Sequence, residues 1–187
     1  KVALPRPLMF NNTVHRPATI QRIRIGATQD GKITAIGHES WSGDLPGGKP
    51  EATVRSTGVV YAGANRMTTS RLASLDLPEG NAMRAPGEAS GMMALEIAMD
   101  EMAEKLGIDP IEFRILNDTQ VVPDNPKKPA SHDPQAQKKP ESGGAENVPF
   151  SQRHLVECLR TGAAEFGWDQ RVAEPGRLRD GRWLIGM

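Results

Sequence analysis

The sequence predicts an α+β fold in which short antiparallel strands come first and two to three helices follow. Two observations support this order. The alternation of apolar and polar residues that is typical of strands occurs in residues 20–36, whereas apolar residues recur at intervals of three and four from residue 88 onward. The chain contains 19 glycines and 15 prolines in 187 residues, which indicates many loops between these elements.

A β-hairpin is the first predicted element. Isoleucine alternates with arginine towards the end of residues 20–25, and a short apolar pattern resumes at residues 33–36 after the turn Gln29-Asp30-Gly31. Glycines and prolines between residues 43 and 50 then indicate an irregular connection. Residues 57–61 offer a third short strand, so the strands are expected within residues 20–61.

The longest predicted helix covers residues 89–106, with its first residue at Glu88 or Ala89 and Gly107 after its end. Its apolar residues advance by three and four and therefore lie on one face. Several of them are methionines, which could suggest a soft metal-binding surface, but the helical spacing favours an ordinary core. This stripe consists of Met92, Leu95, Met99, Met102 and Leu106.

A second helix is predicted at residues 110–117. Asp109 suits the N-cap because its carboxylate can accept hydrogen bonds from the first turn, and Pro110 lacks an N–H that this position would leave unpaired. Glu112, three residues after the cap, can satisfy a further early donor.

A third helix is predicted within residues 148–187, with Ser151 as its cap and Gly167 as its end. Its apolar stripe includes Cys158, the only cysteine of the chain. Packing in a core is the favoured interpretation of that thiol, rather than a reactive role.

Residues 126–147 carry prolines, lysines and a glycine pair without any apolar period. Such a segment cannot bury enough apolar surface to offset its ordering entropy. We interpret it as a flexible insertion on a surface loop, in which trypsin should first cut at Lys127-Lys128 or Lys138-Lys139, bonds preceding proline excepted.

Composition excludes several classes of protein. The 23 basic and 23 acidic residues give a formal net charge of zero, so nothing indicates a dedicated nucleic-acid or anionic-membrane surface. One cysteine allows neither an internal disulfide nor a cysteine cluster for zinc or iron–sulfur ligation. No stretch approaches the length of a membrane-spanning helix. We expect a soluble protein, cytoplasmic or periplasmic.

No motif in the sequence is sufficient for catalysis. The histidines form no close metal-ligand pair, and neither an HExxH nor a CxxC motif is present, so no direct metal site is predicted. His38-Glu39 could be a base with its orienting partner, but simple surface hydrogen bonding near a strand end is favoured. The loop at residues 81–89 places an arginine and a Pro-Gly bend before a helix start, where backbone N–H groups and the macrodipole favour anions.

Three segments together resemble a known family. Arg84-Ala-Pro-Gly-Glu, Ala94-Leu-Glu-Ile-Ala-Met-Asp-Glu-Met-Ala103 and Gly107-Ile-Asp-Pro-Ile-Glu-Phe-Arg-Ile-Leu-Asn117 resemble the molybdopterin-binding large subunit of the xanthine dehydrogenase and aldehyde oxidase family of molybdenum hydroxylases, most of all its bacterial aldehyde-oxidising branch. Residues 15–24, 30–38 and 149–187 are similar to further parts of the same subunit.

The resemblance implies cofactors and a reaction. In this family, molybdenum held by a pterin dithiolene takes oxygen from water and transfers it to an activated carbon, and the electrons pass to iron–sulfur clusters and flavin. It therefore implies molybdopterin, in the cytosine dinucleotide form, with iron–sulfur clusters and FAD on partner subunits or domains. The remainder of the molybdenum subunit is a further implied partner. The implied reaction oxidises a small aldehyde to a carboxylic acid.

The resemblance also implies roles for single residues. Arg84 corresponds to an arginine that approaches the molybdenum ligands and is the implied catalytic residue; Ala85 and Gly87 beside it are implied to contact the cofactor. Pro86 would line the substrate channel, at a place where xanthine-oxidising members have an aromatic residue. Their substrate-binding arginine falls near Ala52 when counted without gaps, with Arg55 the nearest basic residue. Both departures argue against purine substrates.

The chain is expected to be an internal portion of a longer subunit. The family's glycine-rich cofactor segment and its catalytic glutamate lie outside the stretch resembled here. Residues 1–125 would belong to the first molybdopterin-binding domain and residues 148–187 to the start of the following one, and the piece alone should be inactive. An alternative interpretation is a non-catalytic interaction or assembly module that keeps the family scaffold.

Overall fold

The computed structural model describes residues 2–123, 149–174 and 176–186, so the insertion predicted at residues 126–147 lies outside the described part. The chain divides into two compact units, Lys1–Ser151 and Gln152–Met187, which are described separately below. The predicted α+β class is confirmed.

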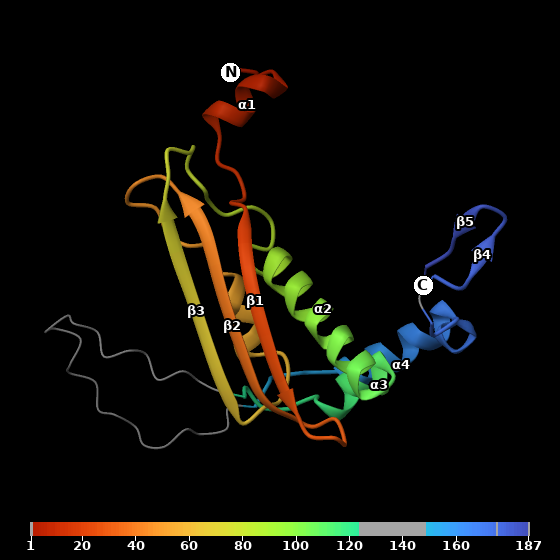
Figure 1. Ribbon diagram of the computed structural model, residues 1–187. Helices are drawn as coiled ribbons and strands as arrows, with labels where there is room; N and C mark the ends of the chain where they lie inside the picture. The colour runs from red at the N-terminus through yellow and green to blue at the C-terminus, as the bar shows by residue number, and fades with distance from the viewer. Residues whose placement is uncertain (1, 124–148, 175, 187) are drawn as a thin grey trace, which may run out of the picture. The chain divides into compact units, whose positions relative to one another are not determined.

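The described residues of the first unit form a three-stranded sheet and three α-helices (Figure 1). In chain order its elements are α1 (Arg6–Asn12), β1 (Thr19–Ala27), β2 (Ile33–Asp44), the 3₁₀ helix η1 (Thr53–Gly58), β3 (Asn65–Ser74), α2 (Glu88–Leu106) and α3 (Pro110–Leu116). The second unit contains α4 (Leu155–Phe166), the 3₁₀ turn η3 (Trp168–Gln170) and a short hairpin of β4 (Arg179–Asp180) and β5 (Trp183–Leu184).

The sheet has the order β1-β2-β3. The predicted hairpin is confirmed, because β1 and β2 pair antiparallel around a turn with Gly31 at φ +89°. The predicted third strand at residues 57–61 is wrong: η1 occupies the start of that range, and the strand is β3, which pairs parallel to β2. A parallel neighbour requires a crossover, and residues 45–64 provide it. The sequence of a short, weakly alternating segment does not determine whether it pairs parallel or antiparallel with its neighbour.

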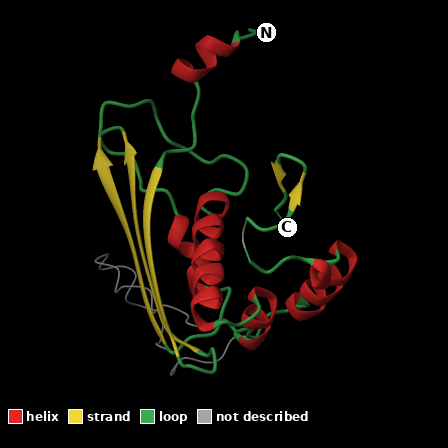
Figure 2. Ribbon diagram, turned by 45° about the vertical axis from the view of Figure 1, so that its right-hand side comes forward, coloured by secondary structure: helices red, strands yellow, loops and turns green. Residues whose placement is uncertain are grey.

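Helix α2 covers one face of the sheet, which gives two layers (Figure 2). The line of α2 residues that is fully buried advances by four: Gly91, Leu95, Met99 and Ala103. The interpretation of the methionine stripe as core is confirmed for Leu95 and Met99, and the other members of the stripe are half-buried beside them. Within the described residues, this small core is completed by Ile33, Ile36, Tyr61 and Phe113.

The inward-facing side chains of strand β2 change from apolar to polar along the strand. Its inward-facing residues begin with Ile36 and continue with four polar residues, His38, Ser40, Ser42 and Asp44, all of them buried. The prediction that His38 lies at the surface is therefore wrong. The strand has 12 residues and continues to Asp44, so His38 occupies a central inward position rather than a strand end. The apolar core gives way to a buried polar layer below the β3–α2 loop.

The helix ends follow the predicted capping for α2 and α3. Gly107 ends α2 in the left-handed conformation at φ 69°. Asp109 caps α3 by accepting from the N–H groups of Ile111 at 2.8 Å and Glu112 at 3.2 Å. Asn117 follows α3 and is buried; its amide binds the backbone of Gly31, Ile33 and Phe113 and so joins α3 to the hairpin turn.

Two predictions about α4 are wrong, although Gly167 ends this helix as expected at φ 75°. The helix begins at Leu155 with His154 at the N-cap, not Ser151, and the cap makes no side-chain hydrogen bond. Cys158 is exposed rather than buried. The apolar stripe predicted a core contact, but no residue of α4 is buried in the described part of the chain.

Candidate functional site

The candidate site is the loop from Glu79 to Gly87 that connects β3 to α2. Arg84 and Pro86 have exposed side chains, as does Ala85 between them, whereas Gly87 is buried. Within the residues that the structure describes, the Arg84 guanidinium makes no hydrogen bond or ion pair. The backbone carbonyl of Arg84 accepts a hydrogen bond from Arg16. Neighbouring side chains therefore hold the loop backbone and leave the arginine head group available.

Gly87 stands at the junction of the loop and α2. It has φ +80°, and a Cβ built on it would lie 2.5 Å from the carbonyl oxygen of Ala52, so only glycine fits. Its N–H donates to a carboxylate oxygen of Glu51 at 2.8 Å. One turn later, a Cβ on Gly91 would lie 1.9 Å from the carbonyl oxygen of Thr53. These close approaches pack the start of α2 directly against residues 51–53.

Arg16 binds the other side of the loop. Its guanidinium donates to the carbonyl oxygens of Arg84 and, at 3.0 Å, of Ala85, and lies 3.4 Å from the carboxylate of Glu51. Arg16 and Glu51 thus hold consecutive parts of the same loop. Sequence reasoning did not assign either residue to the site, and the only signal was that Arg16 lies in one of the segments that resemble the family.

Asp44 fixes the beginning of the loop. It is buried at the end of β2, and its Oδ1 accepts from the N–H groups of Gly80 and Leu45, each at 2.8 Å. These hydrogen bonds, that from Gly80 first, hold the pKa of the Asp44 carboxyl below its ordinary value. His15 adds a backbone contact by accepting from the N–H of Asn81 at 3.1 Å.

A buried chain of hydrogen bonds lies below the first turn of α2. Gln21 donates to the carbonyl of Ser90 at 3.2 Å and presents its amide oxygen to Nε2 of His38 at 3.0 Å. Nε2 of His38 must therefore carry the hydrogen, so Nδ1 accepts from the Thr57 hydroxyl at 2.7 Å. Burial lowers the pKa of His38, in agreement with a neutral ring.

Ala52, the position where xanthine-oxidising members would have their substrate-binding arginine, and Arg55, the nearest basic residue, both lie beside the loop. Ala52 packs its backbone against Gly87, and Arg55 forms a long ion pair of 3.9 Å with Glu88 in the first turn of α2. Residues far apart in sequence are therefore neighbours here. Arg55 is mostly exposed, at 77% of its side-chain surface.

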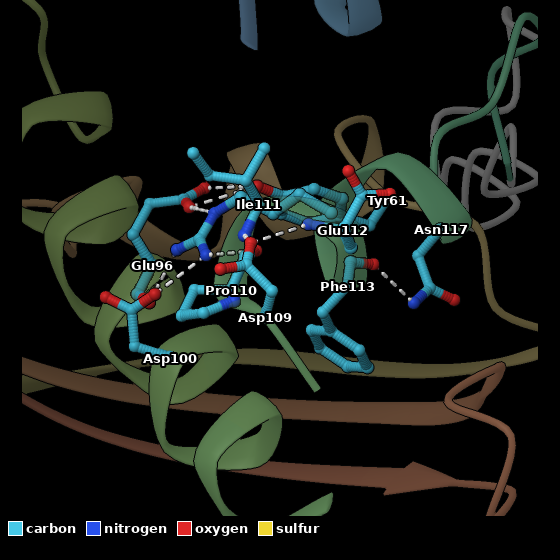
Figure 3. Close-up of polar contacts among 10 residues, drawn as sticks. Tyr61, Glu96, Asp100, Asp109, Pro110, Ile111, Glu112, Phe113 and Asn117 are labelled. Carbon is cyan, nitrogen blue, oxygen red and sulfur yellow. Dashed lines mark hydrogen bonds and ion pairs between the residues drawn. The ribbon is translucent and has the colours of Figure 1, made fainter. Parts of the chain in front are cut away.

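A second polar cluster joins α2 to α3 (Figure 3). Arg114 donates to Glu96 and Asp100, each at 2.7 Å, and the Tyr61 hydroxyl donates to Glu96 at 2.8 Å. Burial and the adjacent Glu96 carboxylate raise the pKa of Tyr61, which keeps its hydroxyl protonated. We interpret this cluster as structural, because each charged member has a partner.

The loop offers donors that suit an anionic group. An exposed guanidinium provides five N–H donors, and the positive end of the 19-residue helix α2 begins at the same point. In the described ranges no set of three or more histidine, cysteine, aspartate or glutamate side chains is placed to hold a metal ion. The exposed Arg84 guanidinium thus fits a negatively charged cofactor, whereas the N–H of Gly87 at the helix start is already bonded to Glu51.

No helix within the described residues has the length and apolar character needed to cross a membrane.

Comparison with known proteins gives the family. Residues 1–118 match the model of the molybdopterin cofactor-binding domain. Over 186 residues the chain is 63% identical to the aldehyde oxidoreductase molybdenum-binding subunit PaoC of Escherichia coli K12, covering all of this chain and 23% of that protein. It is 28% identical over 195 residues to the xanthine dehydrogenase molybdenum-binding subunit of Escherichia coli O157:H7, covering 97% of this chain and again 23% of the relative.

Solved structures share the fold. The aldehyde oxidoreductase from Desulfovibrio desulfuricans superimposes with a TM-score of 0.63 at 24% identity, over 88% of this chain and 17% of that one. Quinoline 2-oxidoreductase from Pseudomonas putida gives a TM-score of 0.62 at 17% identity, over 84% of this chain and 19% of that one. The chain spans about a quarter of the length of the curated relatives it matches. It belongs to the molybdopterin cofactor-binding domain family of molybdenum oxidoreductase subunits.

Proposed function

We propose that the chain is a portion of the catalytic subunit of a molybdenum hydroxylase that oxidises aldehydes to carboxylic acids with water as the oxygen source. The observation that supports this most directly is the loop in which the Arg84 guanidinium, without a partner among the described residues, adjoins Pro86 on a backbone held by Arg16 and Glu51. The much higher identity to a protein named as an aldehyde oxidoreductase subunit than to one named as a xanthine dehydrogenase subunit favours an aldehyde.

The complete enzyme would contain further parts. We infer molybdopterin in the cytosine dinucleotide form, with iron–sulfur clusters and FAD on partner subunits. Residues 1–125 would lie in the first molybdopterin-binding domain and residues 148–187 in the start of the next. Because helices with apolar faces would pack against parts outside this chain, the isolated piece should be loosely packed and inactive.

The chain's own residues would bind the cofactor and orient the substrate. When bound, the molybdenum cofactor supplies the two-electron oxidation and the transfer of oxygen derived from water. Arg84 would donate charge-assisted hydrogen bonds to anionic groups of the cofactor or to a substrate oxygen. Ala85 would bring the exposed loop backbone to the cofactor, and Gly87, buried against Ala52 and bound to Glu51, would hold that backbone in place. Pro86 would form a rigid, apolar part of the substrate channel wall, leaving no aromatic surface on which a purine could stack.

Arg84→Lys in the complete enzyme tests the proposal. Lysine keeps the charge but loses the planar set of donors, so turnover of an aldehyde should fall about tenfold to a thousandfold, as for loss of one preorganised donor near developing charge. Molybdenum content should stay near normal. Arg24 lies on the face of the sheet that α2 does not cover, and its side chain is 68% exposed. Arg24→Lys is therefore the matched control and should leave turnover unchanged.

An arginine that only braced the Pro86-Gly87 bend would give a different result. Its replacement would reduce stability or cofactor loading and leave turnover per molybdenum normal, which would remove Arg84 from the site. Absence of molybdenum from the purified native assembly would instead favour the assembly-module interpretation.

A further inference from the structure

Ala85 has an unusual backbone conformation. With φ +55° it is the only residue other than glycine at positive φ in the part of the chain that the structure describes. Alanine disfavours this left-handed region because its Cβ approaches the following carbonyl. A conformation of this kind persists only where neighbouring groups impose it.

The contacts of Arg16 account for this conformation. The carbonyls of Arg84 and Ala85 flank the Ala85 Cα, and both accept from the same guanidinium. In an extended chain successive carbonyls point in opposite directions, whereas in a helical conformation of either hand they point the same way. The right-handed conformation is disfavoured for Ala85 because proline follows it. The left-handed conformation is the remaining one that presents both carbonyls to Arg16.

Both ends of this arrangement are fixed. The Ala85 carbonyl also accepts from the N–H of Ala89 at 3.1 Å, so its direction follows the axis of α2. Glu51 lies 3.4 Å from Arg16 and also binds the N–H of Gly87, and the side chains of Arg16 and Glu51 are 27% and 10% exposed. Without Arg16 the Arg84 carbonyl would turn away and the Ala85 carbonyl would be held by the N–H of Ala89 alone, so the first turn of α2 would open more often.

We propose that Arg16 is a positioning residue that, together with Pro86, holds Ala85 in the left-handed conformation and thereby sets the direction in which Arg84 presents its guanidinium. The proposal rests on the proposed role of Arg84 in turnover. It gives Pro86 a second task besides lining a channel: by disfavouring the right-handed alternative at Ala85, it makes the loop conformation depend on Arg16.

The test combines Arg16→Met with Ala85→Gly in the complete subunit. Loss of Arg16 should let Ala85 leave the left-handed region and lower turnover per molybdenum about 5- to 30-fold, the population shift that such a backbone preference produces. Glycine adopts positive φ without strain, so adding Ala85→Gly should restore most of that turnover. Ala82→Gly, which places a glycine elsewhere in the same exposed loop, is the matched control and should restore none.

Hydrogen–deuterium exchange of the cofactor-free subunit gives a readout that does not depend on activity. Arg16→Met should speed exchange of the amides of residues 87–89, the added Ala85→Gly should slow it again, and Ala82→Gly should not. If Arg16→Met does not fold, Arg16→Lys replaces it, because a single ammonium holds the two carbonyls less firmly than a planar guanidinium.

The outcomes separate this inference from the proposed function. Unchanged exchange in the Arg16 variants, or equal rescue by Ala82→Gly, would overturn the positioning role even if Arg84→Lys lowers turnover. The expected exchange pattern with normal turnover in both Arg16→Met and Arg84→Lys would support the role of Arg16 in holding the loop and overturn the catalytic role of Arg84.

Discussion

One carboxylate oxygen of Glu51 accepts a hydrogen bond from the backbone N–H of Gly87 at 2.8 Å. This bond joins the segment before η1 to Gly87, the N-cap residue of α2. Glu51 is 10% exposed and also faces Arg16, so its removal leaves two donors without their acceptor. We expect Glu51→Ala to lower the free energy of unfolding by about 1–3 kcal/mol.

Glu51→Gln should recover most of that loss, since the amide oxygen can still accept from Gly87. Urea unfolding of the complete subunit, with Glu101→Ala at an exposed position of α2 as the acidic control, measures the difference. A loss as large for Glu101→Ala as for Glu51→Ala would show that the contact with Gly87 is not what stabilises the loop.

Gly91 and Gly162 offer a matched pair of helical glycines. A Cβ on Gly91 would overlap the Thr53 carbonyl at 1.9 Å, whereas a Cβ on Gly162 meets nothing within 4 Å. Gly91→Ala should therefore destabilise the protein by about 3 kcal/mol or more through overpacking. Gly162→Ala should stabilise it by about 0.5–1 kcal/mol, because alanine loses less backbone entropy in a helix. Denaturation midpoints of the two variants should shift in opposite directions, and equal shifts would contradict the close packing at Gly91.

His38 should make stability depend on pH. Burial lowers its pKa in the folded state below the ordinary value of 6.5, so the unfolded chain binds the proton first as pH falls. The contribution of the neutral ring is complete above pH 6.5 and is lost as pH falls from there towards the folded pKa. His38→Gln should flatten this part of the profile, as measured by urea midpoints over a pH series. His154→Gln, at an exposed histidine, is the control and should leave the slope in place.

Arg114 should be the critical member of the cluster in Figure 3. Its side chain is 11% exposed and pairs with Glu96 and Asp100. The carboxylates of Glu96 and Asp100 are 31% and 59% exposed, so water can solvate them once the guanidinium is gone. We therefore expect Arg114→Ala to cost about 1.5–3 kcal/mol, the range for hydrogen bonds to charged groups. Tyr61→Phe should cost only about 1 kcal/mol, because Glu96 keeps its bond to Arg114. Thermal unfolding checks both, and a Tyr61→Phe loss equal to that of Arg114→Ala would assign the cluster's stability to the hydroxyl.

Features that depend on neighbours along the chain could be predicted from the sequence. The hairpin turn at Gly31, the extent of α2 and the Asp109 cap follow from local preferences of turn, helix and cap residues. The Arg84–Gly87 loop was identified from the resemblance of its sequence to the family. Its bend before a helix start also depends only on neighbouring residues.

The residues that hold that loop could not be predicted, because they come together only in the folded chain. Arg16 and Ala85 are 69 positions apart, and Glu51 and Gly87 are 36 apart, so no periodicity or local preference connects them. The parallel pairing of β3 and the burial of His38 likewise depend on how β2 and η1 pack under α2. Local preferences set the elements, but long-range hydrogen bonds and close packing fix the loop's geometry, because they exist only once those elements are assembled.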